Sequence, residues 1–180
     1  MEHLRGIETV AQEAGAGLVV SVLRRGEFVR TDGAILAATS GQLAGGPGRA
    51  ALEEAGLTGF IEHGSYSYET GLVAAKRLLE RENRPTAIVA SSDNIVLGVL
   101  DGARRRGLDV PGDLSVTGFD DLPASRWSPP PLTTVRQPLR EMGRLAGRTI
   151  LRLLDGKPVE WHNAELTTEL IARASTAAPR

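Results

Sequence analysis

The chain has 180 residues, which allows one large domain or two small lobes, and its hydrophobic content of 41% is ordinary for a globular protein. Its net charge of −1 disfavours nucleic acid as a partner of the chain as a whole, and the absence of cysteine excludes disulfides and thiolate metal sites. No signal peptide or apolar run of the ~20 residues needed for a membrane span is present, so we expect a cytoplasmic protein without membrane contact.

The first third of the chain alternates between helical and extended patterns. Helical spacing of apolar residues over Glu2–Ala14 is followed by two apolar runs, Leu18–Leu23 and Ala34–Ala38, which are typical of buried parallel strands. A glycine-rich loop at Ser40–Gly48 precedes a short helix at Arg49–Ala55. The glycine-rich loop lacks the Lys-Ser/Thr pair of a phosphate-binding loop.

The middle of the chain holds the most informative stretch. After a weak strand at Leu57–Glu62 and a helix at Glu69–Arg81, two apolar runs of β type, Thr86–Ala90 and Leu114–Phe119, bracket a third helix. Gly107 is placed to end that helix. A strand, helix and strand within about 33 residues predict a βαβ unit and therefore a parallel sheet.

Polar residues follow both strands of this unit. Ser91, Ser92 and Asp93 come after the first strand, and Asp120 and Asp121 come after the second. Ligands of open parallel sheets bind at the carboxyl ends of the strands. The sequence therefore places a candidate ligand site at these two strand ends.

The last third begins with an irregular, proline-rich connector at Pro123–Pro131, which contains Trp127. Pro138 is expected at the first position of a long helix that runs to Leu154. An extended segment at Trp161–Ala172 follows. Strands and helices alternate throughout, so we predict an α/β fold with parallel sheets.

The stretch R-P-T-A-I-V-A-S-S-D-N-I-V-L-G-V-L-D-G-A-R-R-R-G-L-D-V-P-G-D-L-S-V-T-G-F-D-D-L-P resembles the effector-binding core of lac-repressor-type transcription regulators. The resemblance continues through S-P-P-P-L-T-T-V-R-Q-P-L-R-E-M-G-R-L-A and ends in E-L-I-A-R-A-S-T at Glu169–Thr176. It is specific from Gly64 to Thr176 and fragmentary before that. It implies the type I periplasmic-binding-protein-like fold, in which three crossing segments join two α/β lobes around a ligand.

The resemblance also implies a division of the chain. The N-terminal lobe would comprise residues 1–56 and 136–165, and the C-terminal lobe residues 57–135 and 166–180. The family's helix-turn-helix domain is not in this sequence, and the N-terminal lobe is about half its expected size. Either segments of a longer protein are missing, with junctions near Arg24–Arg30, Gly41–Gly48 and Gly59–His63, or the protein is a reduced one.

The resemblance points to four candidate ligand residues, Asp120, Ser92, Tyr66 and Asp93. Asp120, the first acid of G-F-D-D, would accept a hydrogen bond from a ligand hydroxyl, or alternatively cap local backbone N–H groups. Ser92 stands where the family has Asn, and Tyr66 would stack on the ligand or pack as a core residue. Asp93 is expected to cap the helix rather than to contact the ligand, and Asp121 is expected to be structural.

The resemblance implies a homodimer, with Val96, Val99 and Leu100 at its interface. Trp127 would lie at this interface, which we favour, or alternatively at the mouth of the ligand cleft. The three arginines Arg104–Arg106 are expected to form a solvated helix end rather than a nucleic-acid site. The three histidines show no metal spacing, and no catalytic pair or cofactor motif is present, so we expect neither a cofactor nor an enzyme.

The resemblance implies one of two functions. The favoured one is the ligand-sensing and dimerisation core of a bacterial transcription regulator that binds a sugar or related metabolite between its lobes. It would act on DNA only through a domain outside this sequence. The alternative is a periplasmic sugar-binding protein that feeds a transporter.

Overall fold

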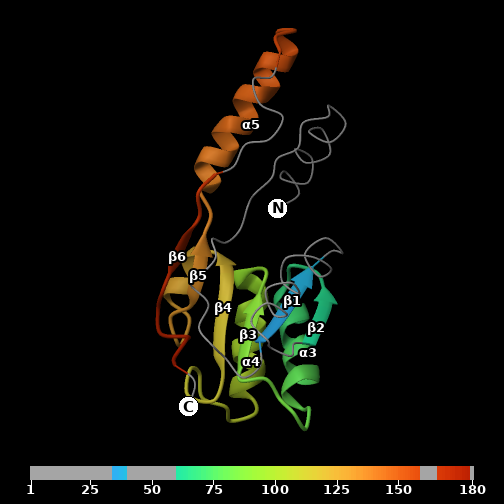
Figure 1. Cartoon of the computed structure of the whole chain (residues 1–180), viewed down its shortest axis with the longest axis vertical. Helices are drawn as coiled ribbons and strands as arrows, with labels where there is room; N and C mark the ends of the chain where they lie inside the picture. The colour runs from blue at the N-terminus through green and yellow to red at the C-terminus, as the bar shows by residue number, and fades with distance from the viewer. Residues whose placement is uncertain (1–33, 40–59, 159–165, 179–180) are drawn as a thin grey trace. The chain divides into compact units, whose positions relative to one another are not determined.

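The computed structural model of the chain describes residues 34–39, 60–158 and 166–178, and these contain a six-stranded sheet of order β2-β1-β3-β4-β5-β6 (Figure 1). All neighbouring strands are parallel except β5 and β6, which are antiparallel. The strands are β1 (Ala34–Thr39), β2 (Phe60–Gly64), β3 (Ala87–Ala90), β4 (Ser115–Asp120), β5 (Thr133–Arg136) and β6 (Glu169–Ile171). The helices are α3 (Tyr68–Leu79), α4 (Asp93–Arg104), α5 (Leu139–Leu154) and the 3-10 helix η1 (Pro123–Arg126).

The predicted βαβ unit is confirmed. β3 and β4 pair in parallel, with Ala87 opposite Ser115, and α4 connects them. The helix predicted at Glu69–Arg81 is also present as α3. The α/β fold with a mostly parallel sheet therefore agrees with the prediction. Pro138 lies one position before its predicted place, because it is the N-cap residue of α5 and not the first residue of the helix.

The chain forms two compact units. One comprises residues 1–25 and 137–168, and the other comprises residues 26–136 and 169–180. The sheet, α3 and α4 belong to the second unit, and α5 belongs to the first. The chain therefore passes between the units three times, after Arg25, after Arg136 and before Glu169.

The position of β1 does not agree with the predicted division into lobes. The prediction places Ala34–Ala38 in the N-terminal lobe, whereas β1 lies between β2 and β3 in the sheet, with Ala34 opposite Ala87. A continuous apolar run indicates a strand buried on both faces but does not specify its neighbours. The helices predicted at Glu2–Ala14 and Arg49–Ala55 and the strand at Leu18–Leu23 lie outside the described residues, as do the proposed junctions at Arg24–Arg30 and Gly41–Gly48.

The core lies between the sheet and the helices α3 and α4, which pack against each other. Glycine allows their backbones to touch: a Cβ on Gly71 would overlap the carbonyl of Ile95, and one on Gly98 would overlap the carbonyl of Tyr68. The fully buried side chains include Leu78, Ile88, Ile95, Leu114, Val116 and Leu132. This close packing fixes the start of α4, next to which the candidate site lies.

Candidate functional site

The candidate site lies at the carboxyl ends of β3 and β4. β3 ends at Ala90, immediately before Ser91 and Ser92, and β4 ends at Asp120, which lies opposite Arg136 of β5. The backbone at Asp120 and Asp121 has φ of 122° and 53°, in the left-handed region that residues other than glycine rarely adopt. Aspartate tolerates this region better than most residues, but such a turn persists only where the surroundings hold it.

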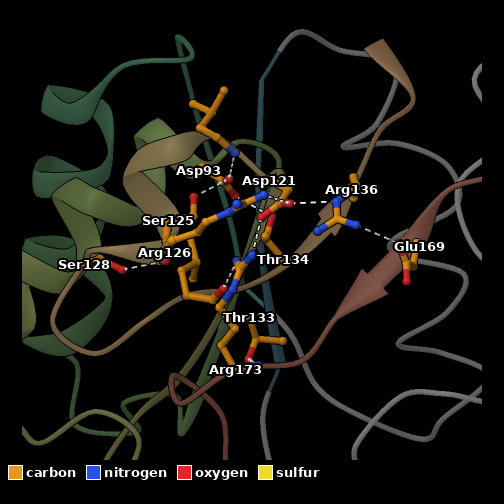
Figure 2. A network of polar contacts seen from close by, with 12 residues as sticks. Asp93, Asp121, Ser125, Arg126, Ser128, Thr133, Thr134, Arg136, Glu169 and Arg173 are labelled. Carbon is orange, nitrogen blue, oxygen red and sulfur yellow. Dashed lines mark hydrogen bonds and ion pairs between the residues drawn. The ribbon is translucent and has the colours of Figure 1, made fainter. Parts of the chain in front are cut away.

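The side chain of Asp121 holds this turn from one side. It is only 2% exposed, and its carboxylate accepts hydrogen bonds from Arg136 Nε at 2.7 Å and from an Arg173 guanidinium nitrogen at 2.5 Å (Figure 2). Burial raises the pKa of the Asp121 carboxyl, but the hydrogen bonds and charges of Arg173 and Arg136 outweigh burial and hold the pKa below its usual range. The predicted structural role of Asp121 agrees with this geometry.

The two arginines extend the network away from Asp121. Arg136 also donates to Glu169 on β6 at 3.0 Å, and Arg173 also donates to the backbone carbonyl of Leu132 at 2.7 Å. A third arginine, Arg126 on η1, lies 3.7 Å from the Asp121 carboxylate. Figure 2 shows Asp121 between Arg173 and Arg136, with Glu169 at the outer end.

Asp93 holds the turn from the other side, and its role differs from the predicted one. Ser92 is the N-cap of α4, while Asp93 is the first helical residue and is completely buried. One carboxylate oxygen of Asp93 accepts hydrogen bonds from Leu122 N at 2.8 Å and Ser125 Oγ at 2.5 Å, and the other accepts one from Thr134 Oγ1 at 2.6 Å. Aspartate is favoured both at the N-cap and in the first turn, so local sequence could not separate the two positions.

Gly118 makes room for Asp93. A Cβ at this position of β4 would overlap Asp93 Oδ1 and crowd Leu132 and Val96. A glycine inside a strand often marks such a close approach. The sequence shows Gly118 within G-F-D-D, but not that it faces a buried carboxylate.

Of the other predicted ligand residues, Ser92 follows β3, whereas Tyr66 follows the edge strand β2. Ser92 is buried, and its Oγ accepts a hydrogen bond from Asn94 N at 3.2 Å. Tyr66 is partly buried and packs against the core. The hydroxyl of Ser91, which was not predicted as a ligand residue, is buried and makes no hydrogen bond with any described residue. A buried hydroxyl without a partner is costly, which makes Ser91 an additional candidate for a ligand contact.

Burial corrects part of the predicted dimer surface. Val96 and Val99 are completely buried in the chain's own core, and Leu100 is only 8% exposed. Their helical spacing defines an apolar face, but that face packs within the unit and is not available to a second chain. Trp127 is 84% exposed, and its place at an interface stays a prediction.

The cluster Arg104–Arg106 is paired with carboxylates. Arg104 and Arg105 both donate to Asp101, at 2.6 Å and 2.9 Å, and Arg106 donates to Glu80 at 2.5 Å. This agrees with a solvated helix end. Within the described ranges, no group of acidic and histidine side chains is placed to hold a metal ion, and no helix is long and apolar enough to cross a bilayer.

Comparison with known proteins assigns the chain to a family. Residues 41–176 match the model of the periplasmic binding protein-like domain. The chain belongs to this family. Its relatives place it in the LacI branch. It is 44% identical over 117 residues to the HTH-type transcriptional regulator MalR of Streptomyces coelicolor, covering 65% of this chain and 33% of MalR.

Further relatives of this periplasmic-binding-protein-like chain are also regulators. Catabolite control protein A of Priestia megaterium is 38% identical over 129 residues, which cover 70% of this chain and 39% of that protein. A LacI family regulator from Bifidobacterium animalis has a TM-score of 0.73 and 35% identity over 83% of this chain and 57% of that one. The chain thus spans little more than a third of the curated relatives it matches.

Proposed function

We propose that this member of the LacI family is the ligand-sensing core of a transcription regulator and binds a small polyhydroxylated effector, a sugar or a related metabolite, at the carboxyl ends of β3 and β4. The observation that carries the proposal is the position of Asp120. It ends β4 in a left-handed turn that partly buried hydrogen bonds hold on both sides. Such strained, over-determined positions cluster at ligand sites.

The chemistry of the strand ends suits a sugar. An ionised carboxylate is an acceptor only, and vicinal hydroxyls are ready donors for it. The buried hydroxyl of Ser91, without a partner in the described part of the chain, can donate to or accept from a ligand. Ser92 accepts from Asn94 N and keeps its O–H as a donor. Tyr66 would offer an aromatic face to the C–H groups of a pyranose.

Relatives support this class of ligand. One solved structure is a complex of the transcriptional regulator CelR with cellobiose, at a TM-score of 0.71 and 31% identity over 81% of this chain and 46% of that one. Another is the lac repressor dimer bound to its operator and the anti-inducer ONPF, at a TM-score of 0.72 and 30% identity. The resemblance of the sequence to lac-repressor-type regulators would place the effector between two lobes.

The proposed regulation follows from the same resemblance. The chain would act in the cytoplasm as a homodimer, without a cofactor and without enzymatic activity. Effector binding would modulate DNA binding by a helix-turn-helix domain that lies outside this sequence. Residues 57–135 and 166–180, together with β1, would form one lobe, and residues 136–165 with the N-terminal part of the chain would form the other.

A thermal-shift screen tests the ligand site. The full chain is heated with a panel of mono- and disaccharides, nucleosides and sugar phosphates, since a ligand at 100 times its Kd adds about 2.7 kcal/mol of stability. We expect at least one compound to raise the Tm of the parent but not that of Asp120→Ala. Glu82→Ala is the control and should show the same rise as the parent, because Glu82 is an exposed residue in the turn after α3. An unchanged shift in Asp120→Ala, or no shift with any compound, contradicts the proposal.

A further inference from the structure

The turn at Asp120 and Asp121 is held at two points. On one side, Asp121 receives hydrogen bonds from Arg136 and Arg173, and on the other, Leu122 N donates to the buried carboxylate of Asp93. Two consecutive aspartates with positive φ would not keep this conformation unaided. The side chain of Asp120 is therefore positioned by groups that do not themselves form the predicted ligand contact.

The same network lies where the chain passes between its two compact units. Arg136 is the last residue of its unit before Gln137, and Glu169 is the first residue after the chain returns. Across the sheet, Asp120 lies opposite Arg136, and Arg136 lies opposite Glu169. The row Asp120–Arg136–Glu169 thus links the end of β4 to two of the three places where the chain passes between the units. The Asp121 carboxylate contacts this row through Arg136.

We infer that Asp121 is a positioning residue that holds Asp120 in its left-handed conformation and couples it, through Arg136 and Glu169, to two of the three segments that connect the units. This inference rests on the proposed role of Asp120 in ligand binding. Displacement of the Asp120 backbone by a ligand would move the Asp121 carboxylate, and with it the Arg136 guanidinium that also bonds Glu169.

The distribution of burial suits such a coupling. Asp121 is 2% exposed and fixed by two arginines, whereas the side chains of Arg136 and Glu169 are 42% and 66% exposed. A buried carboxylate whose partner is removed is left uncompensated, so its contacts are hard to rearrange singly. The outer pair is exposed to solvent and contributes little by itself. The contacts of Asp121 with its two arginines are therefore hard to rearrange, whereas the exposed pair of Arg136 and Glu169 can rearrange more easily.

A first experiment needs no ligand. Hydrogen exchange of the full chain, read by mass spectrometry, is compared in the parent, in Asp121→Asn and in Glu62→Gln, which breaks the ion pair of Glu62 with Arg77 elsewhere in the same unit. We expect faster exchange in β5 and β6 in Asp121→Asn alone, with α3 and α4 unchanged in all three. Unchanged exchange in β5 and β6 overturns the inference.

A second experiment measures effector affinity with the compound that gives the largest thermal shift. We expect the Kd of the effector to rise about tenfold in Asp121→Asn and in Arg136→Gln. The Kd of the double variant should be no higher than that of the weaker-binding single variant, because the effects of coupled residues are not additive. Arg136→Gln leaves the Arg173 contact of Asp121 intact, so it keeps the test decisive if Asp121→Asn does not fold.

The two experiments separate this inference from the proposed function. If the parent binds no compound, the proposed function fails while the exchange data still decide whether Asp121 fastens β5 and β6. If the parent binds through Asp120 but Asp121→Asn and Arg136→Gln bind as tightly as the parent, the proposed function stands and the inference is overturned. Additive losses in the double variant also contradict it.

Discussion

The carboxylate of Asp93 accepts a hydrogen bond of 2.6 Å from the hydroxyl of Thr134, a residue 41 positions later in the chain. Asp93 begins α4 and Thr134 lies on β5, and both side chains are completely buried. With the bonds from Leu122 N and Ser125 Oγ, this contact joins α4, the turn after β4, η1 and β5 at one point. The proposed ligand site is thus built on a buried carboxylate.

Replacing Asp93 with alanine should strongly destabilise the protein. The change leaves Leu122 N and the hydroxyls of Ser125 and Thr134 without their acceptor, and we expect a loss of about 3 kcal/mol in the free energy of unfolding. Urea unfolding measures this loss. Asp155→Ala serves as a control because its ion pair with Lys157 is exposed, and it should change stability little. Equal stabilities of the two variants would contradict the central role of Asp93.

Gly118→Ala should destabilise through the same carboxylate. The added Cβ would overlap Asp93 Oδ1, and overpacking of this kind costs about 1–3 kcal/mol. Gly143→Ala in α5 is the matched control, since a Cβ there meets no atom within 4 Å and alanine favours a helix. Thermal unfolding should lower Tm for Gly118→Ala and not for Gly143→Ala. A stable Gly118→Ala variant would show that Asp93 can move aside.

The Asp121 network should make stability depend on pH at the acid end. Because the folded pKa of Asp121 is depressed, its contribution is present above the unfolded carboxyl pKa of about 3.9 and is lost as pH falls through the folded pKa. Urea unfolding of the parent and of Asp121→Asn should differ most near neutral pH, and the difference should shrink as the pH is lowered below about 4. A constant difference would argue against an ionised Asp121 in the folded protein.

Trp127 should contribute to association and not to folding. Its side chain is 84% exposed, so Trp127→Ala removes little buried surface within the chain. If the proposed homodimer uses this residue, sedimentation velocity should show weaker association for Trp127→Ala with an unchanged midpoint of urea unfolding. A parent chain that sediments as a monomer at micromolar concentration would contradict the dimer itself.

Local signals account for what could be predicted from the sequence. The β3–α4–β4 unit follows from apolar periodicity, helix-capping residues after Ala90 and Gly107, whose φ of 69° suits a position beyond a helix end. The carboxyl ends of the strands, and hence the location of Asp120, follow from the same pattern.

Long-range contacts account for what could not be predicted. The bonds of Asp93 reach 29 to 41 positions along the chain, and those of Asp121 reach Arg173, 52 positions away. Nothing in the periodicity of α4 shows that Val96 and Val99 face the core of their own unit instead of a second chain. The place of β1 in the sheet is likewise a matter of strand pairing, which an apolar run does not specify.

The central claim is that the chain binds a polyhydroxylated effector through Asp120. Isothermal titration calorimetry of the best compound from the thermal-shift panel, with the parent, Asp120→Asn and Glu82→Ala, tests it most directly. We predict saturable binding of one effector per chain in the parent and in Glu82→Ala, with affinity at least about tenfold weaker in Asp120→Asn, since hydrogen bonds to a charged acceptor contribute roughly 1.5–3 kcal/mol. Equal affinity in all three proteins would contradict the claim.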